Sequence, residues 1–563
     1  MKSWLTQSLA VGLAALVSLA SMPARVLAQE AEGIQPVAVI AIASIDEVLG
    51  DIAFVTESAG QGDFGKMVAL LSGGYTVGMD KKRPLGLVVT LKNDEPKAIA
   101  FLPVKNLDAV LAGLEEQLGK PEDAGDGILE LGGRGGNPVY VKEVDGWAYV
   151  SQKANDLATL PRFDPAATVS DLTKNYTLGV QINVGNIPAE MKKAAVAQMQ
   201  AQFERQLQEK LDEQPESQRA VTERYTRTAM EQFTSLIEDT ERFTVGLQID
   251  AQAKTTHLDF ALVARPDTKL AEQMALLKDV TSANAGFLAP DAAIIVHAVN
   301  RLTKEDIELY QDMLKVAREN SLQEIEKDED IESEETRQIA KEVINALFDV
   351  GEKTVAAGVI DGGGALFLTP EGKASLVAGG TVKDAARLEE TLKKLVEAAK
   401  NEPKAPKVNF NTAQHAGVRF HTMSLPIPEK EQEARRIFGQ NLDVALGFGQ
   451  ETVIAAFGPS GVDTAKKILD NSQAKKSETV PPAQLVVALG PILKFASAIK
   501  EDPVTTMLAA TLEQSKGQDH ISLKAEALER GFRSRLEIEQ GVLQLVGAAI
   551  KLMSEGAGQQ QPF

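Results

Sequence analysis

The chain has 563 residues, a formal net charge of −20 and no cysteine. The acidic balance disfavours nucleic acid and anionic membranes as partners, because their phosphates would be repelled. The absence of cysteine excludes disulfides, cysteine-ligated metals and the lipid anchor that is attached to a cysteine at the cleavage site.

Residues 1–28 have the three parts of a secretory signal. Lys2 supplies the positive charge, residues 9–20 form a short apolar core, and Val26-Leu27-Ala28 suits cleavage before Gln29. Later apolar runs are short or interrupted by charge, so the sequence predicts no membrane span. We therefore expect an exported protein, periplasmic or extracellular.

Residues 36–285 and 286–555 resemble two copies of one module. A short apolar strand from Pro36 is echoed from Pro290, and each is followed by a helical pattern. A predicted β-hairpin over 84–104 is echoed over 365–378, and each continues into a helix. The apolar positions of these two helices match at one offset, in the pairs Leu107/Ala385, Val110/Leu388, Leu114/Leu392 and Leu118/Val396. This spacing is that of one buried helix face.

The second half of each module repeats in the same way. A hairpin over 139–151, turning at Asp145-Gly146, is echoed over 442–457, and a lone strand over 177–184 is echoed over 485–489. A long hairpin and a helix close each copy, over 243–277 and 521–553. The alternative is two unrelated α+β domains.

The pattern predicts an α+β fold, a tandem duplication of a mainly antiparallel hairpin/helix module. We expect the helices to pack on one face of each sheet. Residues 189–241 predict a helical arm inserted in the first copy, and 319–340 an acidic helical extension in the second. Residues 556–563 are expected to form a flexible tail.

The stripe of the predicted arm includes Met199, Phe203 and Leu207, with apolar residues at every fourth position. Such helices must pack their apolar stripes against a partner, because they are not stable alone in water. We expect the sheet of module 1 to be that partner. The functional alternative is a movable cover over an apolar ligand.

No catalytic or metal-binding grouping is predicted, and we expect no cofactor and no metal. His415 and His421 lie in one strand-like stretch, where they would stand roughly 20 Å apart and share no ion. His257, His297 and His520 stand singly in predicted strands. The acidic residues around Asp328 fit no calcium loop, and a solvated helical tip is the simpler interpretation.

Trp147 and Tyr149 share one face of a predicted hairpin strand. They could form a platform for a sugar ring or an apolar ligand. A core face under the neighbouring helix is the alternative.

These patterns favour a non-catalytic binding or scaffold protein that holds an apolar ligand between sheet and helices. Candidate ligand contacts are Phe203, Met199, Leu207, Trp147 and Tyr149. A hydrolase with loop-borne carboxylates and a self-assembling envelope component are the alternatives. The partner is expected to be an apolar small ligand or an envelope protein, and the oligomeric state stays open.

N-terminal sequencing of the native protein should return Gln29 as its first residue, in a soluble fraction outside the inner membrane. A signal peptidase needs the small residue Ala28 before the cut. Recovery of an intact Met1, or recovery only in detergent, would contradict export by a cleaved signal.

Overall fold

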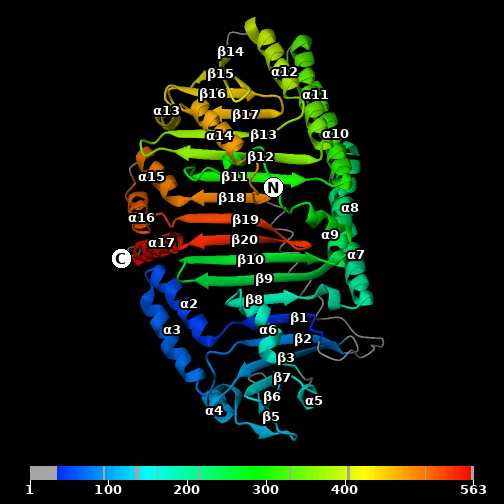
Figure 1. The fold of residues 1–563 in the computed structure, drawn as a ribbon, viewed down its shortest axis with the longest axis vertical. Helices are drawn as coiled ribbons and strands as arrows, with labels where there is room; N and C mark the ends of the chain where they lie inside the picture. The colour runs from blue at the N-terminus through cyan, green and yellow to red at the C-terminus, as the bar shows by residue number, and fades with distance from the viewer. Residues whose placement is uncertain are drawn as a thin grey trace. The chain divides into compact units, whose positions relative to one another are not determined.

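The computed structural model describes residues 35–558 apart from 93–94, 133–137, 161–162, 213–215, 329–330, 332, 402–405 and 501. The predicted signal and the end of the tail lie outside the described residues. The chain is a mixture of helices and antiparallel sheet (Figure 1). It forms two compact units, Met1–Ala271 and Glu272–Phe563, whereas the repeat in the sequence places the division after residue 285.

The sheet of the first unit has the strand order β4-β5-β6-β7-β3-β2-β1-β8-β9-β10. All of these ladders are antiparallel. The strands are β1 Ala38–Ile42, β2 Leu85–Lys92, β3 Glu95–Pro103, β4 Glu122–Asp123, β5 Ile128–Gly132, β6 Pro138–Val144, β7 Trp147–Ser151, β8 Leu178–Ile182, β9 Thr240–Asp250 and β10 Thr255–Ala264.

The sheet of the second unit has the order β14-β15-β16-β17-β13-β12-β11-β18-β19-β20, again antiparallel throughout. The strands are β11 Ile294–Arg301, β12 Val359–Leu368, β13 Ala374–Thr381, β14 Val408–His415, β15 Val418–Pro426, β16 Asn441–Phe448, β17 Thr452–Phe457, β18 Ala483–Ala488, β19 His520–Leu528 and β20 Gly531–Glu539. Adding ten to each strand number of the first unit reproduces this order.

Most of the helices also fall at matching places between the strands, although α5 and α13 have no counterpart in the other unit. Those that begin in the first unit are α2 Ile45–Ser58, α3 Gly62–Tyr75, α4 Leu107–Leu118, α5 Ala154–Ala158, α6 Pro165–Thr173, α7 Ala189–Asp212, α8 Glu216–Asp239 and α9 Lys269–Ala275. Those of the second are α10 Lys304–Lys327, α11 Glu334–Ala356, α12 Ala385–Ala398, α13 Gln432–Phe438, α14 Gly461–Lys475, α15 Leu489–Ile499, α16 Pro503–Gln514 and α17 Gln540–Gly558. Short 3₁₀ turns lie at Val184–Asn186, Ala285–Phe287 and Ala399–Asn401.

The two predicted insertions are longer versions of helix pairs that both units have. The pair α7–α8 lies between β8 and β9, where the second unit has the shorter pair α15–α16. The acidic stretch belongs to α10–α11, which follows β11 as α2–α3 follows β1. Each unit therefore has a helix pair at both places, and α7–α8 and α10–α11 are the longer pairs. Periodicity shows that helices are present, but not which helix is their counterpart.

Side-chain caps fix where several of these helices begin. Ser44 and Asn106 each accept the backbone N–H three residues on, at the starts of α2 and α4. Thr303 and Asp306 form a reciprocal capping box at α10. Such caps satisfy amide groups that the first helical turn leaves without partners.

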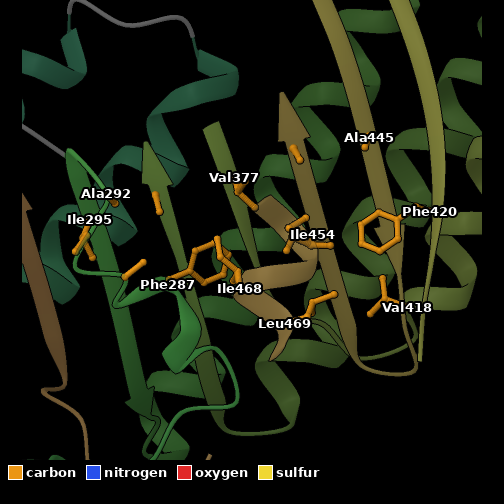
Figure 2. Packing of buried hydrophobic residues seen from close by; sticks show 14 residues of the cluster. Phe287, Ala292, Ile295, Val377, Val418, Phe420, Ala445, Ile454, Ile468 and Leu469 are labelled. Atoms are coloured by element: carbon orange, nitrogen blue, oxygen red, sulfur yellow. The ribbon is translucent and has the colours of Figure 1, made fainter. Parts of the chain in front are cut away.

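One face of each sheet, here called the covered face, packs against helices and forms the main core of its unit. In the second unit α14 lies across it, and Phe287, Phe420, Ile454 and Ile468 interdigitate there at 2% exposure or less (Figure 2). In the first unit α5 and α6 take this place, and their Leu157 and Val169 belong to the same buried cluster as Val39 and Phe101 of the sheet. Tyr176 follows α6 and packs on Gly246, where a Cβ would lie 2.3 Å from its ring.

Helices contact both faces of each sheet, so the prediction of one helical face is wrong. In the first unit α4 packs its Leu107 and Leu111 on Leu131 and Ala148, on the side away from Trp147. In the second unit α12 contacts the opposite face through Glu389. The alternation of β7 decides this, because its residues Trp147 and Tyr149 point to one face and Ala148 points to the other.

The stretch from His415 to His421 is a hairpin and not the single strand that we expected. His415 ends β14, Ala416 and Gly417 turn with positive φ, and His421 lies in β15. Gly417 accepts the left-handed conformation of this tight turn because glycine has no side-chain clash, whereas Ala416 adopts it at a steric cost.

Ile454→Ala should lower the free energy of unfolding by about 2–5 kcal/mol, as large truncations in a close-packed core do. The matched control is Leu376→Ala, which removes a similar volume from a side chain that is 42% exposed on the other face, against 2% for Ile454. Denaturant titration of both variants is the measurement. Equal losses would show that the two faces are equally packed.

Candidate functional site: an open apolar sheet face

A buried serine, histidine and aspartate meet in the second unit, a grouping that sequence spacing did not reveal. Ser282 Oγ donates to Asp361 Oδ1 at 2.6 Å, and His297 Nε2 lies 2.9 Å from the same Oγ. All three residues are at most 6% exposed. Burial lowers the pKa of His297, although the nearby Asp361 opposes the shift.

This grouping is not arranged for nucleophilic catalysis. A catalytic histidine stands between the hydroxyl and the carboxylate, whereas here Ser282 stands between His297 and Asp361. Nδ1 of His297 is buried and has no hydrogen-bond partner among the described residues. The backbone N–H groups of Ala283 and Asn284 also donate to Asp361 and Ser282, which ties the loop to β12.

A second buried cluster centres on Glu389 of α12. It accepts hydrogen bonds from Arg419 and from Lys393 Nζ at 2.7 Å, and His421 Nε2 lies 3.2 Å away. The bond from Arg419 is the main reason why the pKa of Glu389 falls to about 2. The backbone N–H of Asn411 donates to His421 Nδ1, so Nε2 carries the proton. This carboxylate is saturated with donors and holds α12 to β15, which does not suit a general acid.

The tip of α10–α11 offers little to a calcium ion. Arg337 donates to the carbonyl oxygens of Ile325, Glu326 and Ile331, so a guanidinium occupies the end of α10. Glu329 and Asp330 lie outside the described residues. A depression of about 500 Å³ beside it has the lining Ser321, Glu324, Ile325, Lys327, Asp328 and Ile344.

Trp147 and Tyr149 are part of the first unit's core, each 4% exposed. The rings of Phe101 and Trp147 meet edge to face at 5.7 Å, and the Arg83 guanidinium lies 4.0 Å above the Trp147 ring. Neither ring has an exposed face that a ligand could contact. Both residues are therefore part of the core, and they do not form a ligand platform.

The predicted arm residues meet α8 and not the sheet that we expected. Leu207 is buried, while Phe203 and Met199 are half-buried along α7. Arg227 of α8 pairs with Glu204 of α7 at 2.6 Å, and a depression of about 370 Å³ between the helices is lined in part by Phe203. Two neighbouring helices can bury each other's stripes, which removes the need for a sheet beneath them. The structure places the arm residues and the Trp147 pair in separate clusters.

The feature that sequence reasoning missed is the open face of the second unit's sheet, opposite the covered face. Val296, Leu485 and Leu376 are 50%, 39% and 42% exposed there, whereas their neighbours Ile295 and Val377 on the covered face are 6% and 0% exposed. Register places the members of this face side by side: Ile294, Val296 and Ala298 (β11), Ile360, Gly362, Gly364 and Leu366 (β12), Leu376, Ala378 and Gly380 (β13), Val453, Ala455 and Phe457 (β17), Ala483, Leu485 and Val487 (β18), Ile521, Leu523 and Ala525 (β19), Ser534, Leu536 and Ile538 (β20).

The first unit has a similar open face. Ile40 and Leu178 are 37% and 40% exposed. Register aligns them with apolar residues of the neighbouring strands, namely Leu85, Leu87 and Val89 (β2), Val180 and Ile182 (β8), Phe243, Val245 and Leu247 (β9), Leu258 and Phe260 (β10).

The composition of the second unit's open face sets it apart from ordinary surface. Seven strands at about 4.8 Å spacing, with about three residue positions each at about 6.8 Å, give on the order of 400 Å². None of its members is charged, Ser534 is the one hydroxyl among them, and the exposed amide of Asn300 borders the face beside Ile360. The largest apolar patch on a typical folded monomer is about 300–600 Å² and is often functional, so this face is a candidate interaction site. It offers dispersion and hydrophobic contacts but no pattern of side-chain hydrogen-bond donors and acceptors that would select a polar ligand.

No family model, curated protein or solved structure matches the chain. Among the described helices, none is both long enough and apolar enough to cross a membrane.

His297→Gln should flatten the loss of stability that acid causes. Burial lowers the pKa of His297 below its ordinary value of 6.5, so below pH 6.5 the unfolded chain binds a proton that the folded chain does not. The free energy of unfolding should therefore fall as pH drops from 6.5, and by less in the variant. Urea titrations at pH 7.0, 6.5 and 5.5 measure the difference, and parallel curves for both proteins would contradict it.

Proposed function

We propose that the chain is an exported, non-catalytic binding protein of the cell envelope, built from two duplicated modules that each hold an apolar ligand on the open face of their sheet. The single observation that carries the proposal is the uncharged, exposed open face of the second unit. The shared strand order of the two units supports the duplication.

The chemistry of the open face favours the hydrocarbon chain of a lipid as the ligand. A ligand with polar groups along its length would lose hydrogen bonds to water and find no partners in exchange. A hydrocarbon chain has no hydrogen bonds to water to lose. Its binding is favoured by a free energy of about 25 cal/mol for each Å² of apolar surface removed from water. A second copy of the chain is less well suited, because each copy carries a net charge of −20.

Val296→Glu should abolish the binding of a fluorescent fatty acid to the second unit, a loss of at least about tenfold in affinity, because an unpaired charge would be buried beneath the ligand. The matched control is Val359→Glu. Val359 is 37% exposed and lies on β12 with its side chain on the opposite face. Fluorescence titration of the full chain measures the affinity, and thermal melting shows whether each variant folds.

Three outcomes separate the alternatives. Loss of one of two fatty-acid sites per chain in Val296→Glu, with both sites kept in Val359→Glu, supports the proposal. Equal binding by both variants overturns it. A chain that binds no fatty acid but is dimeric in sedimentation, and becomes monomeric with Val296→Glu, would instead support a self-assembling envelope component.

A further inference from the structure

We propose that Asp519, His520 and Glu539 form a binding site for one divalent transition-metal ion of the Zn²⁺ class. The three residues lie at one end of the β19–β20 hairpin. His520 is the first residue of β19 and Glu539 is the last of β20. Each is next to a residue of the open face, Ile521 or Ile538, so its side chain points to the opposite face of the sheet. The site is therefore independent of the proposed lipid ligand.

The distances suit a small cation. His520 Nδ1 lies 2.9 Å from Glu539 Oε2 and 3.4 Å from Asp519 Oδ1. One ligand atom from each residue lies within 4.8 Å of the others. Ligand atoms around a tetrahedral zinc ion, with bonds of about 2.0–2.2 Å, stand about 3.3–3.5 Å apart. The 3.4 Å separation of His520 Nδ1 and Asp519 Oδ1 already fits this spacing, and the His520–Glu539 pair needs to open by only a few tenths of an ångström.

Both carboxylates are already held in place by backbone amides. The N–H of Gly490, in the first turn of α15, donates to Asp519 Oδ2 at 2.6 Å. The N–H of His520 donates to Glu539 Oε2 at 2.9 Å. Hydrogen bonds of this kind orient metal ligands and tune their affinity. Asp519 is itself largely buried, with its side chain 9% exposed.

A buried polar group beside the cluster points to a missing partner. Ser522 lies on the same face of β19 as His520, two residues along, and is 6% exposed. Its hydroxyl has no hydrogen-bond partner among the described residues, and neither has the buried Oε1 of Gln518. A buried polar atom without a partner is costly. A water molecule on the metal would supply one, since three protein ligands leave a coordination position open.

The ligand set selects the class of metal. Two carboxylates balance the charge of a divalent ion, and one imidazole nitrogen favours Zn²⁺ over the hard cations Ca²⁺ and Mg²⁺. In the first unit the corresponding end of the β9–β10 hairpin pairs Thr240 with Ala264, which offer neither imidazole nor carboxylate. One site per chain is therefore expected. In a chain without cysteine, the ion would fasten the hairpin to the start of α15.

Isothermal titration of the chelator-treated full chain with ZnCl₂ should give one site per chain and a rise in melting temperature that CaCl₂ does not produce. His520→Ala should abolish this binding, and Glu539→Gln should weaken it by at least about tenfold. The control is His415→Ala. Its imidazole is about as exposed as that of His520, at 33% against 35%, and pairs with the carboxylate of Asp470.

The absence of a binding heat would overturn the site, and the histidine would then be a hydrogen-bonded bridge between two carboxylates. Binding that survives both His520→Ala and Glu539→Gln would also overturn it, because the ion would then lie elsewhere. If His520→Ala does not fold, Glu539→Gln decides the question, since it keeps the size of the side chain.

Discussion

Each unit of this protein depends on the same constraint, which is that its strands are apolar on both faces while its helices cover only part of that surface. In the second unit, α14 removes Ile454, Phe420 and Val377 from water almost completely. The residues that alternate with them, such as Leu376 and Val296, stay exposed. Successive side chains of a strand point to opposite faces of the sheet, so burying one set leaves the alternating set on the other face. Because that second set is also apolar in these strands, an apolar open face remains in the fold.

Most helices that might have covered the open face are engaged elsewhere, and α12 reaches this side of the sheet at β15 and β16. The pairs α2–α3, α7–α8, α10–α11 and α15–α16 each pack on their own partner. In the second unit, α10–α12 lie at one end of the strands and α15–α17 at the other (Figure 1). Ion pairs reinforce this arrangement, with Asp349 of α11 accepting from Arg318 of α10 and Arg387 of α12 at 2.6 Å each. Helices that stand at strand ends leave the middle of the sheet free for a ligand.

The buried polar clusters hold neighbouring segments of the fold together. Ser282 and Asp361 anchor a loop to β12, and Glu389 holds α12 to β15. In both, the hydrogen-bonding capacity of the carboxylate is used by fixed donors, so a substrate would have to displace buried partners. The trio at Asp519 differs because its histidine is about one-third exposed and its two carboxylates converge on one nitrogen. That difference separates a candidate ligand site from a structural network.

The sequence by itself determined the local elements. Alternation and turn residues predict the hairpins of β2–β3, β6–β7 and β19–β20, and four-residue periodicity predicts α7 and α8. It also showed that Trp147 and Tyr149 share a face. These are properties of neighbours along the chain, which local periodicity records.

Only the tertiary structure decided which apolar residues are covered. The sequence of β11 is apolar at Ile294, Ile295 and Val296 alike, which is typical of a strand with helices on both sides. The fold covers Ile295 and leaves Val296 half exposed. It likewise brought Asp519, His520 and Glu539 together across a hairpin, and gave α7 a helix as its partner. Burial depends on which distant element lies above a residue, and composition and spacing carry no information on that point.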